Sequence, residues 1–291
     1  MFQEFERLRL KVNGEEISLV LGGSGPPLLL LHGHPQTHAI WHKVASTLAR
    51  EFTVVATDLR GYGDSGKPHG LADHSNYSKR VMAQDHVEVM SALGHARFRV
   101  LAHDRGARVA HRMAVDHPER VLRLVTLDIA PTLAMYEKTN LEFAARYFHW
   151  FFLIRPFPFP ETLISADPKL YLKHTMESRS AGLAPFSPDA YAEYTRCILD
   201  PRTVHGICED YRASAGIDLD HDRTDLAQGR KVGCPMLVLW GAQGVVGKVV
   251  DPLAEWNLVA RDVRGKSLDC GHYMAEEAPE AILAEVLPFL R

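Results

Sequence analysis

Short apolar segments alternate with amphipathic segments along this chain, and this alternation restricts the fold more than any other feature. Four strongly apolar runs occur in the first half of the chain: PPLLLLHG (26–33), FTVVATD (52–58), FRVLAHD (98–104) and VLRLVTLD (121–128). The segments between them, 41–50, 78–94 and 106–118, have the apolar spacing or the stop signals of helices. Continuous apolar strands separated by helices are typical of a mostly parallel, twisted sheet that helices cover on both faces. We therefore predict an α/β fold.

The alternation stops at Pro131 and returns about a hundred residues later. Residues 132–229 are aromatic and helical, without a clear buried strand. MLVLWG (236–241) and DVRGKSLD (262–269) then predict two more strands, and EEAPEAILAEVLPFL (276–290) predicts a closing helix. We expect one core, formed by 1–131 and 230–291, with 132–229 inserted as a helical cap.

Charge and cysteine content exclude several classes of function. The formal net charge is −3, which does not favour nucleic acid or an anionic membrane as a partner. None of the four cysteines belongs to a C-x-x-C pair, so we expect no metal and no redox cofactor. The aromatic run 148–160 is too short to span a bilayer, and the charged N-terminus lacks an apolar signal core. We predict a cytoplasmic protein that acts on a small molecule.

Polar residues follow several of the predicted strands: HGHP (32–35), HDRG (103–106), Asp128 and CGH (270–272). Ligands of parallel sheets bind beyond the carboxyl ends of the strands, so these residues are candidates for a site. Small residues at 102 and 106 fit a sharp strand-to-helix turn that would expose Asp104. The helix N-terminus favours an ionised carboxylate there, and such a carboxylate can attack an alkyl carbon to form an ester.

Two arginines follow this aspartate. Arg105 and Arg108 are three residues apart on a predicted helix, so they share a face. Because guanidinium groups pair well with carboxylates, they predict a substrate that carries its own carboxylate. The alternative is that Arg108 forms an ion pair at the surface.

The motifs resemble those of a known family. HGHPQTHAIWHKVA, DLRGYGDSGKP, LAHDRGARVAHRMAVDHP and CGHYM resemble α/β-hydrolases of the haloalkane dehalogenase and epoxide hydrolase branch. HDRGARVAHR, YFHWFF and HGICEDYRA are more closely similar to the fluoroacetate (haloacetate) dehalogenases. The resemblance covers nearly the whole chain. It implies an α/β-hydrolase fold with a cap, a homodimer, and cofactor-free hydrolysis of a 2-haloacetate to glycolate and halide.

The resemblance also implies roles for the polar residues. Asp104 would be the nucleophile, His272 the base that activates water, and Asp128 the acid that orients this histidine. Asp251 and Asp269 stay open as alternatives for the acid, because many relatives place it after a later strand. The backbone N–H groups of His34 and Arg105 would form an oxyanion hole.

Three cap residues would contact the departing halide. The resemblance implies that His149, Trp150 and Tyr211 donate hydrogen bonds to it, and each side chain has a donor. The alternative is that these aromatic residues form only the core of the cap. The sequence departs from the family at His34, where HGFP is expected, and in the cap stretch 174–188. The preferred halide therefore stays open.

Two other functions compete with dehalogenation. An epoxide hydrolase shares HGxP and the aspartate nucleophile but uses cap tyrosines on the epoxide oxygen, and the two arginines disfavour it. A ligand receptor on the same fold would need no attacking carboxylate, so the complete Asp–His–Asp set disfavours it.

Overall fold

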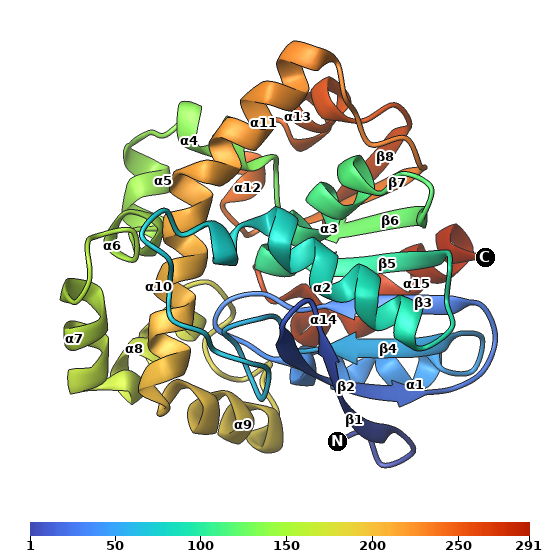
Figure 1. Ribbon diagram of the computed structural model, residues 1–291, viewed down its shortest axis with the longest axis horizontal. Coiled ribbons are helices and arrows are strands. Elements are labelled where there is room, and N and C mark those ends of the chain that lie inside the picture. The colour runs from blue at the N-terminus through green and yellow to red at the C-terminus, as the bar shows by residue number, and fades with distance from the viewer.

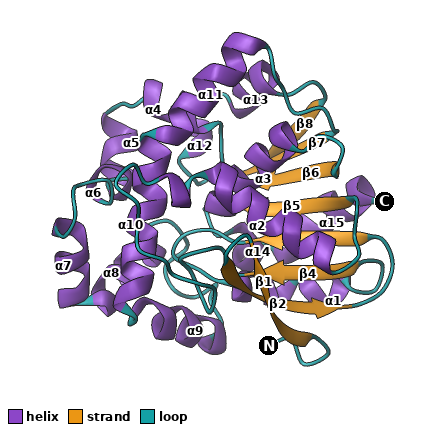
Figure 2. Ribbon diagram, viewed as in Figure 1, coloured by secondary structure: helices purple, strands orange, loops and turns teal.

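A single eight-stranded sheet forms the centre of the computed structural model, which describes residues 1–291. The strand order is β1-β2-β4-β3-β5-β6-β7-β8, and Figure 2 shows the strands crossing one half of the molecule. The strands are Glu6–Val12 (β1), Glu15–Gly22 (β2), Pro27–Leu31 (β3), Thr53–Thr57 (β4), Phe98–His103 (β5), Val121–Leu127 (β6), Met236–Gly241 (β7) and Val263–Leu268 (β8). β2 is antiparallel to β1 and β4, and all pairs from β4 to β8 are parallel. The predicted mostly parallel sheet is confirmed.

Helices cover both faces of this sheet. The helices of the core are His38–Lys43 (η1), Ala45–Leu48 (α1), Ser75–Tyr77 (η2), Lys79–Ala92 (α2), Asp104–Asp116 (α3), Val246–Val249 (α12), Pro252–Val259 (α13), Met274–Glu277 (α14) and Pro279–Leu290 (α15). In Figure 1, α2 and α3 lie in front of the sheet, and α1 and α15 lie behind it. Side chains of β5 alternate accordingly: Val100 packs into one apolar core and Leu101 into the other.

Eight helices are inserted between β6 and β7, where the alternation of apolar runs is interrupted in the sequence. They are Thr132–Glu137 (α4), Leu141–Arg146 (α5), His149–Phe152 (α6), Phe159–Ala166 (α7), Pro168–Glu177 (α8), Pro188–Ile198 (α9), Pro201–Ala215 (α10) and Ile217–Gln228 (α11). Figure 1 shows them gathered at one end of the sheet, and we call them the cap. No helix of the protein combines the length and the apolar character needed to cross a membrane.

Three local features differ from the sequence prediction. The hairpin β1–β2 was not predicted, although Asn13 and Gly14 both have positive φ (46° and 80°), as a tight hairpin turn requires. The predicted helix 41–50 is instead the 3₁₀ helix η1 followed by the four-residue α1. The predicted helix 276–290 is divided at Ala278, because the residue before a proline disfavours helical dihedral angles.

Candidate active site

The turn between β5 and α3 presents Asp104 at the end of the sheet. Asp104 has a φ of +46°, a conformation that non-glycine residues adopt rarely and at some cost in energy. Gly106 permits the turn, because a Cβ atom there would lie 2.3 Å from the carbonyl oxygen of His32. The sequence therefore folds here into the sharp strand-to-helix turn that its small residues predicted.

The Asp104 carboxylate has a different neighbour at each oxygen. Oδ1 accepts a hydrogen bond of 2.8 Å from the backbone N–H of His34, and Oδ2 lies 3.7 Å from Nε2 of His272. Burial by itself would raise the pKa of Asp104, but nearby charges, including that of Arg179, hold this pKa well below its usual range. Asp104 is therefore ionised, with one oxygen fixed by the backbone and the other directed toward the histidine.

His272 is oriented by a second carboxylate. Its Nδ1 lies 2.6 Å from Oδ2 of Asp128, whose Oδ1 accepts a 2.9 Å hydrogen bond from the backbone N–H of Gly241. With the proton on Nδ1, Nε2 is free to accept a proton on the side of Asp104. Burial, together with the charge of Arg179, lowers the pKa of His272 to about 3, so the imidazole is neutral at pH 7.

The two other acids considered as partners of His272 lie elsewhere. Asp251 caps the N-terminus of α13 and accepts from the N–H groups of Leu253 and Ala254. Asp269 accepts a hydrogen bond from Gln243 at the surface. Only Asp128 among the three contacts the histidine.

The two arginines of α3 have different surroundings. Nε and Nη2 of Arg105 each donate a 2.9 Å hydrogen bond to the carboxylate of Asp210, while Nη1 has no partner. Sequence reasoning missed Asp210, although it lies in CEDYRA beside Tyr211. Arg108 donates from Nη1 to the carbonyl of Ala130 (3.0 Å) and the hydroxyl of Thr132 (2.9 Å), and its Nε has no partner.

Arg108 has no carboxylate partner. It is only 4% exposed, so the alternative of a surface ion pair is wrong. A buried guanidinium that contacts only neutral oxygens is costly, which makes Arg108 a strong candidate to bind an anion.

His149, Trp150 and Tyr211 meet around these arginines. The Tyr211 ring lies 5.7 Å from that of His149 and 6.3 Å from that of Trp150. The Arg105 guanidinium lies 4.0 Å from the Tyr211 ring, and that of Arg108 lies 4.6 Å from the Trp150 ring. Nε2 of His149, Nε1 of Trp150 and the Tyr211 hydroxyl are buried without a hydrogen-bond partner. Such a concentration of unpaired polar atoms is unusual in a core that serves packing alone.

His34 and Arg179 complete the surroundings of Asp104. The His34 ring lies 5.8 Å from that of His149 and 5.5 Å from that of Tyr211. Arg179 donates from Nη2 to the His34 carbonyl (3.1 Å) and belongs to the stretch 174–188 that departs from the family. Sequence reasoning missed Arg179, because no motif or spacing distinguishes it from the other arginines of the cap.

The cap contains one group of side chains of the types that bind metal ions. Ligand atoms of Glu161, His205 and Glu209 lie within 4.8 Å of one another. Arg212 already donates to both carboxylates, at 2.6 Å and 2.7 Å, and so balances their charge. These residues are therefore explained by an internal ion pair.

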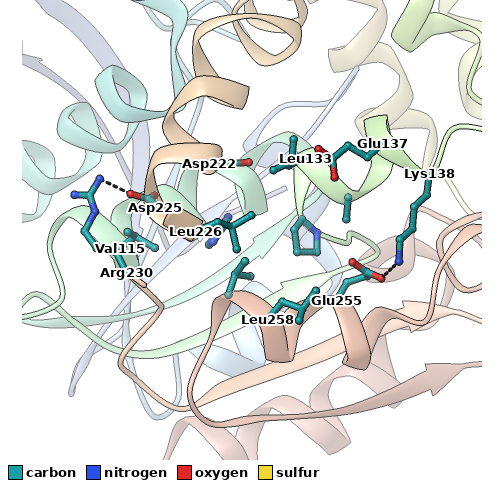
Figure 3. A pocket seen from close by; sticks show the side chains of 14 residues that line it. Val115, Leu133, Glu137, Lys138, Asp222, Asp225, Leu226, Arg230, Glu255 and Leu258 are labelled. Atoms are coloured by element: carbon teal, nitrogen blue, oxygen red, sulfur yellow. Dashed lines mark hydrogen bonds and ion pairs between the residues drawn. The ribbon is translucent and has the colours of Figure 1, made fainter. Parts of the chain in front are cut away.

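A separate cavity of about 170 Å³ lies between α3, α4, α11 and α13 (Figure 3). Its charged side chains are largely paired with each other, Arg230 with Asp225 and Lys138 with Glu255. None of the residues that line it belongs to the surroundings of Asp104 described above.

Comparisons with known proteins agree with this geometry. The family model described as the alpha/beta hydrolase fold matches residues 26–279. The chain is 45% identical to a fluoroacetate dehalogenase from a Burkholderia species, covering 96% of this chain and 92% of that protein. It is 34% identical to a soluble epoxide hydrolase from Corynebacterium sp. (strain C12), covering 99% and 98%.

Solved structures show the same relationship. ALR0039 from Nostoc sp PCC 7120 superposes with a TM-score of 0.98 at 56% identity, covering 100% of this chain and 99% of that chain. The epoxide hydrolase CorEH gives a TM-score of 0.90 at 32% identity, covering 98% of each chain. The chain therefore belongs to the α/β-hydrolase family. Within this family, the predicted similarity to the haloacetate dehalogenases is confirmed.

Proposed function

We propose that this enzyme hydrolyses the carbon–halogen bond of 2-haloacetates through an ester on Asp104. Oδ2 of Asp104 attacks the α-carbon, and the halide leaves with the electron pair of the broken bond. The unpartnered donors of His149, Trp150 and Tyr211 stabilise the charge that develops on the halogen. Arg105 and Arg108 bind the substrate carboxylate.

Water then hydrolyses the ester. Nε2 of His272 takes a proton from water, and the oxygen attacks the carbonyl carbon of the Asp104 ester. The negative charge forms on Oδ1, which the N–H of His34 already contacts at 2.8 Å, and the N–H of Arg105 is the second proposed donor. Glycolate leaves with the proton from His272, and the Asp104 carboxylate returns. The overall products are glycolate, halide and one proton.

The buried guanidinium of Arg108 is the observation that carries this proposal. It lies one helical turn from the nucleophile, and only neutral oxygens contact it. A substrate carboxylate would supply the missing opposite charge. An epoxide carries no such charge, so hydrolysis of epoxides would leave Arg108 unexplained.

One observation favours the epoxide hydrolase as the second candidate. Three cap tyrosines lie near the nucleophile: Tyr147 is 3.2 Å from His272, Tyr171 is 3.1 Å from His34, and the Tyr211 hydroxyl has no partner. The epoxide hydrolase relative gives this candidate further support.

A direct assay distinguishes the two candidates. Halide release from fluoroacetate, chloroacetate and bromoacetate would be measured beside diol formation from styrene oxide. We expect halide release and little diol. A single turnover in ¹⁸O-labelled water should place the label in the Asp104 carboxylate. Label in glycolate alone would contradict the ester mechanism. Three further statements remain predictions from the sequence: the cytoplasmic location, the homodimer, and the boundaries of the cap at residues 132 and 229.

A further inference from the structure

Arg179 is a third buried guanidinium beside the nucleophile. Its side chain lies at the end of α8, and the residue is only 7% exposed. Nε donates to the Thr175 carbonyl at 3.0 Å, and Nη2 donates to the His34 carbonyl and the Tyr273 hydroxyl. Nη1 is buried without a partner, and no carboxylate lies within ion-pair distance. The groups that accept its hydrogen bonds are all neutral, and the charge of Arg179 acts on the Asp104 carboxylate without direct contact.

Hydrogen bonds of the backbone connect Arg179 to Asp104 and to His272. His34 accepts from Arg179 through its carbonyl and donates to Asp104 through its N–H. The carbonyl of Arg179 accepts a 2.9 Å hydrogen bond from the N–H of His272. The guanidinium also lies 5.7 Å from the ring of Tyr147, whose hydroxyl contacts His272. Arg179 therefore borders the nucleophile and the base from the cap.

Its position differs from that of the other two arginines. Arg105 and Arg108 belong to α3 and contact Tyr211 and Trp150, whereas Arg179 contacts the chain around His34 and Tyr273. A haloacetate has one carboxylate, which the α3 arginines would bind. It offers no second anion to Arg179.

A cavity also lies beside Arg179. A cavity of about 150 Å³ lies between the cap and the core, and Arg179, Tyr147 and His272 line it together with Gly244 and Ser180. This cavity reaches the base that activates water.

We infer that Arg179 binds a second carboxylate, and that the preferred substrates are four-carbon 2-halodicarboxylic acids such as 2-bromosuccinate. This inference rests on the proposed dehalogenase reaction. The C1 carboxylate binds the α3 arginines, and the C4 carboxylate binds Arg179. Oδ2 of Asp104 forms a bond to C2 while the carbon–bromine bond breaks and bromide leaves. Hydrolysis of the ester then gives 2-hydroxysuccinate, bromide and a proton.

The test compares 2-bromosuccinate with its C4 amide, which has nearly the same shape but lacks the second charge. Hydrolysis and elimination both release bromide, so formation of 2-hydroxysuccinate or its amide is the measurement that identifies hydrolysis. For the unmodified enzyme, we expect kcat/KM to be at least about tenfold higher for the diacid than for the amide, as for a charge-assisted pair. In Arg179→Met this ratio should fall to about one, and in Arg179→Lys it should be partly kept.

Arg146→Met is the matched control. Arg146 lines the same cavity, but its side chain is half exposed and lies 3.3 Å from Glu142. Because solvent screens this charge, its loss should change the ratio less than about twofold. Inhibition of bromoacetate turnover by succinate and by succinamate needs no variant, and succinate should bind at least about tenfold more tightly.

The outcomes separate this inference from the proposed function. Failure to release bromide from every haloacid, including bromoacetate, would contradict the dehalogenase reaction itself. Turnover of bromoacetate with equal kcat/KM for diacid and amide, or equal inhibition by succinate and succinamate, would overturn only the role of Arg179. A high ratio that persists in Arg179→Met would overturn it too.

Discussion

Replacing Tyr211 by phenylalanine removes one hydroxyl group and leaves the aromatic ring in place. The residue is fully buried, and its hydroxyl has no hydrogen-bond partner within the protein. The substitution therefore breaks no hydrogen bond of the free enzyme, and the free energy of unfolding should not fall. The ring should keep its contact with the Arg105 guanidinium at 4.0 Å.

The cost should instead appear as the carbon–halogen bond breaks. Losing one preorganised donor to a developing anion costs about 2–4 kcal/mol, or about 30- to 900-fold in rate. Fluoride concentrates its charge on a small atom and leaves poorly, so it depends on the donor more than bromide does. We expect kcat/KM to fall by this amount for fluoroacetate and much less for bromoacetate.

Tyr194→Phe is the control in the same cap. The Tyr194 hydroxyl donates to Glu276 at 3.2 Å, away from the unpartnered donors. Its loss should lower the free energy of unfolding by about 1 kcal/mol without changing the fluoroacetate-to-bromoacetate ratio. A constant ratio in Tyr211→Phe would refute the assignment of Tyr211 as a halide donor.

Three further predictions concern the nucleophile, the base and the substrate carboxylate. His272→Asn should allow alkylation but stop hydrolysis, so mass spectrometry should find one glycolyl ester on Asp104; an unmodified Asp104 in the folded variant would count against covalent catalysis. Arg108→Leu should reduce kcat/KM for a haloacetate by a factor that corresponds to about 2–5 kcal/mol of transition-state stabilisation, with a smaller effect on a neutral haloamide, whereas equal losses would assign Arg108 to the fold. Burial lowers the pKa of His272 to about 3, so the base stays neutral as the pH falls from 8 to 5 and ester hydrolysis in a single turnover should stay nearly constant. A loss of rate centred near pH 6.5 would show an unperturbed imidazole.

The sequence by itself determined the class of fold and the position of Asp104, the proposed nucleophile. Buried strands and helices are local patterns, and the carboxyl ends of parallel strands meet at one edge of the sheet. Asp104, Asp128 and His272 each follow a predicted strand or its loop, so their convergence could be expected. The turn at Asp104 was also predictable, because the small residue Gly106 permits the close approach of the backbone within three residues of the strand.

Only the tertiary structure decided how the charges are paired. Asp128 and His272 are 144 residues apart, and the sequence favoured Asp128 but left Asp251 and Asp269 open as alternatives. Nothing in the local pattern showed that Asp210 would bind Arg105, or that Arg108 and Arg179 would be buried without a carboxylate. These outcomes depend on how the cap helices pack over the sheet. Burial and pairing are set by side chains from distant segments, which local periodicity does not encode.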